Sequence, residues 1–370
     1  MDFKNYLVPG KTGLLIGIGG VSMSPLAEVL HDAGLDIRGS DMAESSNTLT
    51  LRERGIPIHI GHSADNVTDD ISFVIRTAAV HDDNPEVHEA HRRGIPVFER
   101  TQAWGALMRG YQNALCISGT HGKTTTTSMC THIMMAAEKD PTVMIGGTLP
   151  LLKACHRVGK GNTIIMESCE YYNSFLALNP TIAVVLNIEA DHLDFFKDLE
   201  DIKHSFRCFA ERVPAETGTV IANYDDANTM DALRGIARKV ITFGLNAKAD
   251  VYAQNIVHRG SVSEFDIYHR GNYFARVTLH VPGIHNVRNA LAATAAAIVL
   301  GVSPNAVKYG LAGFEGAGRR FDFKGKFQGA DLYDDYAHHP SELRALLDAV
   351  DTLNYQRTIV VFQPHTYSRT

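Results

Sequence analysis

The sequence predicts an α/β protein of several domains, in which short strands alternate with helices. Apolar runs of strand length alternate with helical patterns through most of the 370 residues, and glycine-rich turns follow two of these runs. A chain of this length is too long for one compact core, so two or three domains are expected. The alternating pattern restarts near residue 110 and again after residue 322. We therefore predict domains at residues 1–110, 111–322 and 323–370.

Composition excludes several classes of protein. Charged residues make up 21% of the chain and hydrophobic residues 45%, which is ordinary for a soluble globular protein. The net charge of −6, without a region rich in Lys and Arg, argues against a nucleic-acid partner. The five cysteines show no C-x-x-C spacing, so neither a disulfide framework nor a zinc site is expected from them, and a cytoplasmic location fits. No stretch resembles a membrane span or a signal peptide. The sequence does not indicate the oligomeric state.

The first domain is predicted to be a doubly wound parallel sheet. A strand at residues 14–16 leads into a glycine turn and a helix to about residue 33, and a second strand ends near Asp41. Gly17, Gly19 and Asp41 match part of the dinucleotide fingerprint, whereas Ser22 stands where a third glycine is expected. The turn could bind a pyrophosphate or could simply join strand to helix. Further strands are predicted at residues 71–77 and 95–98.

The second domain is predicted to be a phosphate-loop ATPase domain of the α/β class. A strand at residues 114–117 precedes a glycine turn, and a helix is predicted from residue 129 to 137. The turn amides and the helix dipole would bind an anion such as a triphosphate. Lys123 would reach the outer phosphates, and the Thr124 hydroxyl would bind Mg²⁺. Ile117 stands where the strict motif has glycine, so a helix start without a ligand is the alternative.

Acidic and imidazole side chains follow two further strands of this domain. The strand at residues 162–166 ends at Glu167, and the strand at 182–186 leads to His192; another strand is expected at 142–145. Ligands bind at the carboxyl ends of parallel strands. Glu167 and His192 are therefore candidates to hold the metal with Thr124, and a helix cap and a plain loop residue are the alternatives.

The last 120 residues predict added antiparallel strands and an incomplete third domain. Alternation between residues 250 and 281 indicates a hairpin around Arg270-Gly271-Asn272, and an Ala-rich helix should run to about residue 300. The third α/β domain should begin with a strand, a helix and a strand at residues 358–362. One such unit cannot bury its own faces, so we expect residues 323–370 to be protease-sensitive.

Five motifs occur in the order seen in the Mur ligases, and the chain resembles that family over its whole length. They are Gly119-Thr120-His121-Gly122-Lys123-Thr124-Thr125, Glu167-x-x-Glu170, Asn187-Ile188-Glu189-x-Asp191-His192, Gly283-x-His285-Asn286 and Asp335-Tyr336-Ala337-His338-His339-Pro340. The resemblance implies a three-domain enzyme of peptidoglycan precursor synthesis that uses ATP and Mg²⁺. It is closest to members that ligate L-alanine to the lactyl carboxylate of UDP-N-acetylmuramate through an acyl phosphate.

The resemblance also implies a role for each matching residue. Lys123, His192 and Arg320 would be catalytic, and Thr124, Glu167 and His192 would hold Mg²⁺. The implied nucleotide-binding residues are Gly119, Thr120, His121, Gly122, Lys123, Thr124, Thr125, His285, Asn286, Arg320 and Asp335. The implied substrate-binding residues are Gly17, Gly19, Gly20, Ser22 and Asp41 for the UDP-sugar and Tyr336, His338 and Arg369 for the amino acid.

Departures from the family pattern leave alternatives open. Residues 205–207 read Ser-Phe-Arg where related ligases carry a modified lysine, and Cys169 with Tyr171 leaves the role of Glu170 undecided. A sister ligase that attaches a recycled tripeptide to the same UDP-sugar shares nearly every motif. A nucleotide-binding protein without turnover is a third interpretation, because the family's third domain is expected to continue beyond Thr370.

Overall fold

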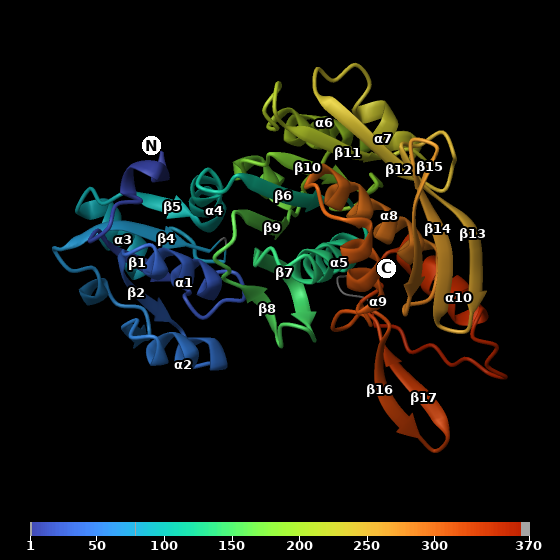
Figure 1. Cartoon of the computed structure of the whole chain (residues 1–370). Helices are drawn as coiled ribbons and strands as arrows, with labels where there is room; N and C mark the ends of the chain where they lie inside the picture. The colour runs from blue at the N-terminus through green and yellow to red at the C-terminus, as the bar shows by residue number, and fades with distance from the viewer. Residues whose placement is uncertain (1, 78, 364–370) are drawn as a thin grey trace. The chain divides into compact units, whose positions relative to one another are not determined.

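The computed structural model describes residues 2–77 and 79–363. The chain forms two compact units, one of Met1–Gln112 with Ala177–Asn179 and one of Asn113–Leu176 with Pro180–Thr370 (Figure 1). The predicted division into three domains stays a prediction. Within the described residues, no helix is both long and apolar enough to cross a membrane.

The first unit is a five-stranded parallel sheet with helices between its strands, as the alternating pattern predicted. Its strand order is β3-β2-β1-β4-β5. The strands are β1 (Thr12–Ile16), β2 (Asp36–Asp41), β3 (Ile58–Ile60), β4 (Ile71–Arg76) and β5 (Val97–Glu99). The helices are α1 (Ser24–Asp32), α2 (Ser46–Glu53), α3 (Pro85–Arg92) and α4 (Arg100–Met108), with short 3-10 turns η1 (Phe3–Tyr6) and η2 (Ala64–Asn66). Because β1 pairs with β2 on one side and β4 on the other, its carboxyl end is the switch point where such sheets bind ligands.

The second unit is built on a ten-stranded mixed sheet, in the order β15-β14-β13-β12-β11-β10-β6-β9-β7-β8. The strands are β6 (Asn113–Ser118), β7 (Thr142–Leu149), β8 (Ala154–Arg157), β9 (Thr163–Glu167), β10 (Ile182–Val185), β11 (Thr219–Asn223), β12 (Lys239–Gly244), β13 (Val251–Arg259), β14 (Val262–His269) and β15 (Asn272–Leu279). The middle strands are parallel, and β13, β14 and β15 pair antiparallel. The predicted hairpin is therefore confirmed, with its turn at Arg270 and Gly271.

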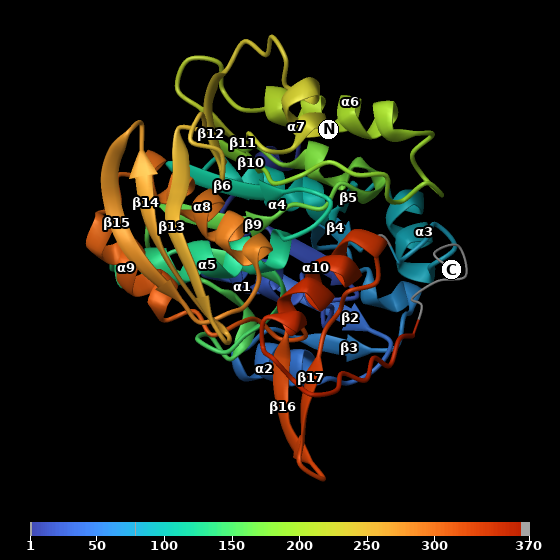
Figure 2. The ribbon, with the colours of Figure 1, turned by 90° about the vertical axis from the view of Figure 1, so that its right-hand side faces the viewer.

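Helices cover both faces of this sheet (Figure 2). They are α5 (Lys123–Ala136), α6 (Leu199–Glu211), α7 (Ala227–Ala232), α8 (Ile284–Val299) and α9 (Pro304–Ala312), with the 3-10 segment η3 (Tyr171–Ala177). The helices α5 and α8 pack together on one face, and α6 and α7 lie on the other. The apolar side chains of α5 and α8 join the sheet in one buried cluster that includes Ile133, Val184 and Leu291.

The helix α5 begins at Lys123, six residues before the start that the apolar pattern predicted. Two of its threonines are accommodated by hydrogen bonds within the helix: Thr127 Oγ1 donates to the Lys123 carbonyl and Thr131 Oγ1 to that of Thr127, both at 2.8 Å. α9 crosses α5 closely at Gly310, where a Cβ atom would lie 2.5 Å from the Ile133 Cα atom. α9 therefore holds α5 near its carboxyl end.

The third part of the sequence differs from its prediction. A hairpin of β16 (Asp322–Phe327) and β17 (Ala330–Asp334) precedes α10 (Pro340–Asp351). The predicted strand at residues 358–362 is wrong, because these residues are in neither a strand nor a bridge. A strand needs a neighbour for its backbone amides and carbonyls, and among the described residues no strand pairs with 358–362. Arg369 lies outside the described residues.

Candidate nucleotide and metal site

The turn between β6 and α5 has the shape of a phosphate loop. Gly119 has φ +144° and Gly122 φ +82°, and a Cβ atom at Gly122 would lie 2.7 Å from Asn289 Oδ1. Asn187, which follows β10, braces the turn: its carbonyl accepts from the Thr120 amide at 3.0 Å, and its Oδ1 accepts from the His121 amide at 2.8 Å. The backbone of the turn is therefore fixed, with the positive end of α5 behind it.

Lys123 forms a buried ion pair that the sequence left undecided. Its Nζ lies 3.0 Å from Glu170 Oε2 and donates to the carbonyls of Gly119 at 2.5 Å and Thr120 at 3.1 Å. Burial by itself lowers the pKa of Lys123, but the Glu170 carboxylate outweighs it and the pKa is raised. The side chain is therefore a fixed ammonium group at the mouth of the loop. Glu170 is the group that keeps this charge stable.

Two of the three predicted metal ligands are in contact. Thr124 Oγ1 donates to Glu167 Oε1 at 3.1 Å, and Glu167 Oε2 accepts from the Gly146 amide at 2.7 Å. His192 has φ 54°, stacks on the Tyr171 ring at 4.2 Å, and its Nε2 lies 3.9 Å from Glu170 Oε1. A hydroxyl and a carboxylate are oxygen ligands of the kind that Mg²⁺ prefers, so Thr124 and Glu167 fit this ion. The metal role of all three residues stays a prediction.

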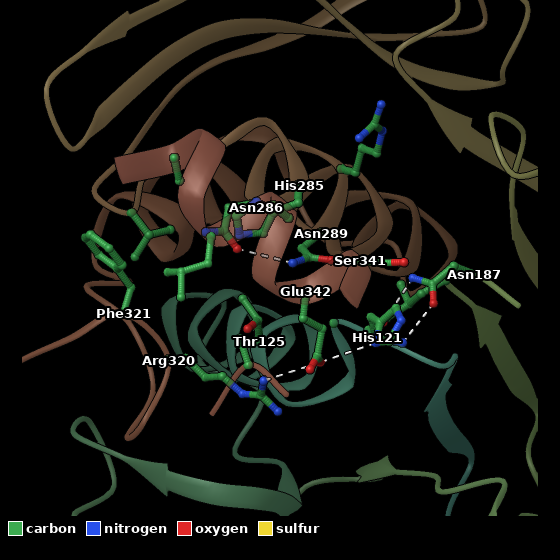
Figure 3. Close-up of a pocket in the computed structure, with 18 of the residues that line it drawn as sticks. His121, Thr125, Asn187, His285, Asn286, Asn289, Arg320, Phe321, Ser341 and Glu342 are labelled. Carbon is green, nitrogen blue, oxygen red and sulfur yellow. Dashed lines mark hydrogen bonds and ion pairs between the residues drawn. The ribbon is translucent and has the colours of Figure 1, made fainter. Parts of the chain in front are cut away.

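A cavity of about 310 Å³ opens beside the phosphate loop (Figure 3). His121 and Thr125 line it from the loop and α5; α8 contributes His285, Asn286 and Asn289; Arg320, Phe321, Asp335, Ser341 and Glu342 come from the C-terminal part. Asn286 Nδ2 donates to the Pro282 carbonyl at 2.7 Å, and its Oδ1 accepts from Asn289 at 3.2 Å. Burial lowers the pKa of His285 to about 4, so this ring is neutral at pH 7.

The N-terminus of α10 contacts the phosphate loop through charged groups. Glu342 Oε1 lies 3.3 Å from His121 Nδ1 and 3.8 Å from Arg320 Nη1 (Figure 3). On the other side of the ring, His121 Nε2 lies 3.5 Å from Glu189 Oε2. Burial lowers the pKa of His121, but the two carboxylates raise it to about 9. Burial raises the pKa of Glu342, but His121 and Arg320 hold it at about 2. His121 is therefore an imidazolium between two carboxylates at pH 7.

The other predicted residues of the C-terminal part form one turn. Asp335 accepts from the amides of Phe321 and Ala337, both at 2.7 Å, and burial raises its pKa despite these bonds. Arg319 and Arg320 lie over the Tyr336 ring, at 4.6 and 5.3 Å. His338 Nδ1 lies 2.8 Å from the Tyr336 carbonyl. Asp335 and Arg320 thus line the cavity.

The glycine turn of the first unit forms a second cavity, of about 610 Å³, that is lined by Gly17, Gly19, Gly20 and Asp41. Asp41 Oδ2 accepts from the Gly19 amide at 2.8 Å, so this carboxylate shapes the turn. Ser22, predicted for the same site, accepts a hydrogen bond from Arg100. His62 also lines the cavity, held by the buried Glu86 carboxylate at 2.8 Å. Sequence reasoning missed His62, because nothing local marks it.

Several residues of the cavity beside the phosphate loop were also missed. Asn187 and Glu189 were quoted only as part of a motif, although both contact the phosphate loop. Glu342 follows His339 by three residues, the spacing of a capping box, and the structure shows that box. That spacing signals a helix start, but it does not reveal that the same carboxylate reaches His121.

The comparisons with known proteins agree over nearly the whole chain. Family models match residues 15–112 (Mur ligase family, catalytic domain), 117–297 (Mur ligase middle domain) and 319–369 (Mur ligase, glutamate ligase domain). The chain is 47% identical over 356 residues to the UDP-N-acetylmuramate–L-alanine ligase of Agathobacter rectalis, covering 96% of this chain and 77% of that protein. The chain belongs to the Mur ligase family.

Other Mur ligases extend the comparison. The UDP-N-acetylmuramate–L-alanine ligase of Clostridium novyi is 45% identical, with 100% of this chain and 80% of that protein covered. The solved UDP-N-acetylmuramate–alanine ligase of Thermotoga maritima superimposes with a TM-score of 0.77 at 31% identity, covering 92% of this chain and 78% of that one. The UDP-N-acetylmuramate:L-alanyl-γ-D-glutamyl-meso-diaminopimelate ligase of Neisseria meningitides gives 0.74 at 26% identity, covering 83% and 99%.

Proposed function

We propose that this Mur ligase joins L-alanine to UDP-N-acetylmuramate with ATP as co-substrate, a step of peptidoglycan precursor synthesis. The 47% identity to an L-alanine ligase over 96% of the chain carries this proposal. The tripeptide ligase is a weaker match, at 26% identity to the solved example. Because ATP is the co-substrate, the proposed reaction belongs to the cytoplasm.

The chemistry explains why a phosphate loop serves a ligase. A carboxylate is a poor electrophile and an oxyanion a poor leaving group, so transfer of the γ-phosphoryl group to the lactyl carboxylate prepares it for attack. The amine of alanine then forms the amide bond, and inorganic phosphate leaves. Bringing a carboxylate to a triphosphate sets negative charge against negative charge. Lys123 and Arg320 are the protein cations that we assign to screen it.

The oxygen ligands beside Lys123 fit a magnesium ion. In the proposal, Thr124 and Glu167 hold one Mg²⁺ and His192 contributes to a second site. Bound Mg²⁺ supplies positive charge to the phosphate oxygens. His285, Asn286 and the fixed turn at Asp335 surround the adenosine, because they line the same cavity as the loop.

The UDP-sugar is proposed to bind at the glycine turn of the first unit. Gly17 has φ +78°, and a Cβ atom at Gly19 would lie 2.7 Å from Thr48 Cγ2, so both positions of the turn at the carboxyl end of β1 require glycine. A pyrophosphate suits this position, because Gly17, Gly19 and Gly20 line the cavity between the carboxyl end of β1 and the start of α1.

One assay separates the three interpretations. The chain is incubated with UDP-N-acetylmuramate, MgATP and either L-alanine or L-alanyl-γ-D-glutamyl-meso-diaminopimelate, and the phosphate released and the product mass are measured. Ligated product with L-alanine is expected. Product with the tripeptide alone would assign the chain to the sister activity. Nucleotide binding without product from either amine would leave a binding protein without turnover, and Lys123→Ala is the inactive control.

A further inference from the structure

Two histidines and a glutamate meet where α10 touches the phosphate loop. His121 precedes α5, Glu189 follows β10, and His339 is the N-cap of α10. Their ligand atoms all lie within 4.8 Å of one another, a grouping of three that occurs at this one place in the described part of the chain. We refer to these three residues as the His121 cluster. It is separate from Thr124, Glu167 and His192.

The spacing of the His121 cluster suits a small ion with four ligands. His121 Nε2 lies 3.5 Å from Glu189 Oε2, and His339 Nδ1 lies 3.7 Å from the same oxygen. A tetrahedral Zn²⁺ with bonds of about 2.0–2.1 Å has ligand atoms about 3.3–3.4 Å apart. The two separations from Glu189 therefore need to shorten by only a few tenths of an ångström, and the two histidine nitrogens lie within 4.8 Å of each other.

The outer nitrogen of each ring is already held by an acceptor. Glu342 Oε1 lies 3.3 Å from His121 Nδ1, and the Ala190 carbonyl lies 3.3 Å from His339 Nε2. Because a carbonyl can only accept, the His339 proton is on Nε2, and the lone pair of Nδ1 is directed inward. Acceptors behind the ring are the usual support of a metal-bound histidine. His121 Nε2 is buried and faces Glu189 Oε2 at 3.5 Å, so the ion would replace the proton that this nitrogen carries at pH 7.

We propose that the His121 cluster binds a divalent transition metal, with Zn²⁺ as the best match to two imidazoles and one carboxylate. The ion replaces two interactions of Ser341, whose hydroxyl donates to Glu189 and whose amide lies 3.3 Å from His339 Nδ1. Imidazole ligands favour Zn²⁺ over Mg²⁺. The ion ties the phosphate loop to α10 inside the nucleotide cavity, so it competes with ATP.

The metal alone tests the binding, independently of the proposed ligase activity. Zn²⁺ is titrated into the metal-free chain by calorimetry, with excess Mg²⁺ present to occupy oxygen-rich sites, and one ion per chain is expected. Glu189→Gln and His339→Asn each remove one ligand and should weaken binding at least tenfold. Asparagine is a good N-cap, so H339N keeps the start of α10. His338→Asn is the matched control and should bind Zn²⁺ like the parent.

Two further readouts guard against a folding artefact. Thermal unfolding checks that each variant is folded, and Co²⁺ should give the visible absorption of a tetrahedral site in the parent and in H338N but not in E189Q. Absence of Zn²⁺ binding, equal affinity in all four proteins, or an equal loss in H338N would each overturn the site. A non-hydrolysable ATP analogue should weaken Zn²⁺ binding, and an unchanged Zn²⁺ affinity would refute the competition.

Discussion

Replacing Lys123 by Met tests how much the buried ion pair between Lys123 and Glu170 contributes to stability. The Lys123 side chain is 15% exposed and that of Glu170 3% exposed, so removal of the ammonium leaves a carboxylate buried without its main partner. Breaking a buried pair in this way costs about 3–5 kcal/mol. The lower part of that range is expected, because the polar His192 ring, with Nε2 3.9 Å from Glu170 Oε1, stays beside the carboxylate. K123M should therefore lower the free energy of unfolding of the second unit by about 3 kcal/mol.

The double variant Lys123→Met/Glu170→Gln carries no uncompensated charge and should recover at least about 2 kcal/mol of that loss. Urea unfolding followed by circular dichroism measures both variants. The fluorescence of Trp104, the single tryptophan, reports the first unit and should not change its midpoint. Ligase turnover should fall by about 100-fold or more in both variants. Both lack the Lys123 ammonium group, and removing one electrostatic donor to a reacting group lowers kcat by about that factor. If the double variant is no more stable than K123M, the buried-charge argument is wrong.

Three further outcomes are expected. The pKa of His121 is raised to about 9, above its ordinary value, so its ion pairs stabilise α10 on the loop fully below about pH 6.5 and are lost as the pH rises through 9. The hydrogen-exchange protection factors of α10, which are corrected for the intrinsic pH dependence of exchange, should be lower at pH 10 than at pH 7, and His121→Gln should remove that difference. Gly19→Ala places a methyl group 2.7 Å from Thr48 and should weaken UDP-sugar binding at least tenfold in calorimetry, with ATP binding unchanged; equal loss of both would refute separate sites. Phe175→Ala opens a cavity under the stacked Phe209 ring and should cost about 3–5 kcal/mol of unfolding free energy, and a loss below 1 kcal/mol would contradict that packing.

The fold class could be predicted because local patterns carry it. Apolar runs of strand length alternate with helical periods, and the glycines at positions 17, 119 and 122 interrupt that pattern where the backbone has positive φ. The hairpin at Gly271 was visible for the same reason. The strand at residues 358–362 was predicted from its apolar residues alone. An apolar run becomes a strand only beside a partner, and the sequence pattern does not state which strand that partner is.

The candidate site could be predicted only in part. Lys123 and Thr124 follow from the loop motif, and Glu167 follows from its place at the end of a strand. The contacts between α10 and the phosphate-loop region could not be predicted, because they join residues that are far apart in the sequence. Ser341 and Glu189, for example, are 152 positions apart. The partner of Lys123 was left undecided for a related reason, since spacing brings Glu170 near the loop but burial decides that it forms the ion pair.

The close crossing of α9 over α5 limits how this enzyme can diverge. A side chain at position 310 would collide with the backbone of Ile133, which cannot change its rotamer to make room as a flexible side chain can. Other positions of α9 can accept substitutions, but position 310 can accept only glycine as long as the two helices keep their contact. The phosphate loop leads directly into α5, so displacing this helix at Ile133 would also disturb the loop, and selection on nucleotide chemistry extends to a residue of another helix. A library randomised at position 310 and selected for growth should return glycine alone.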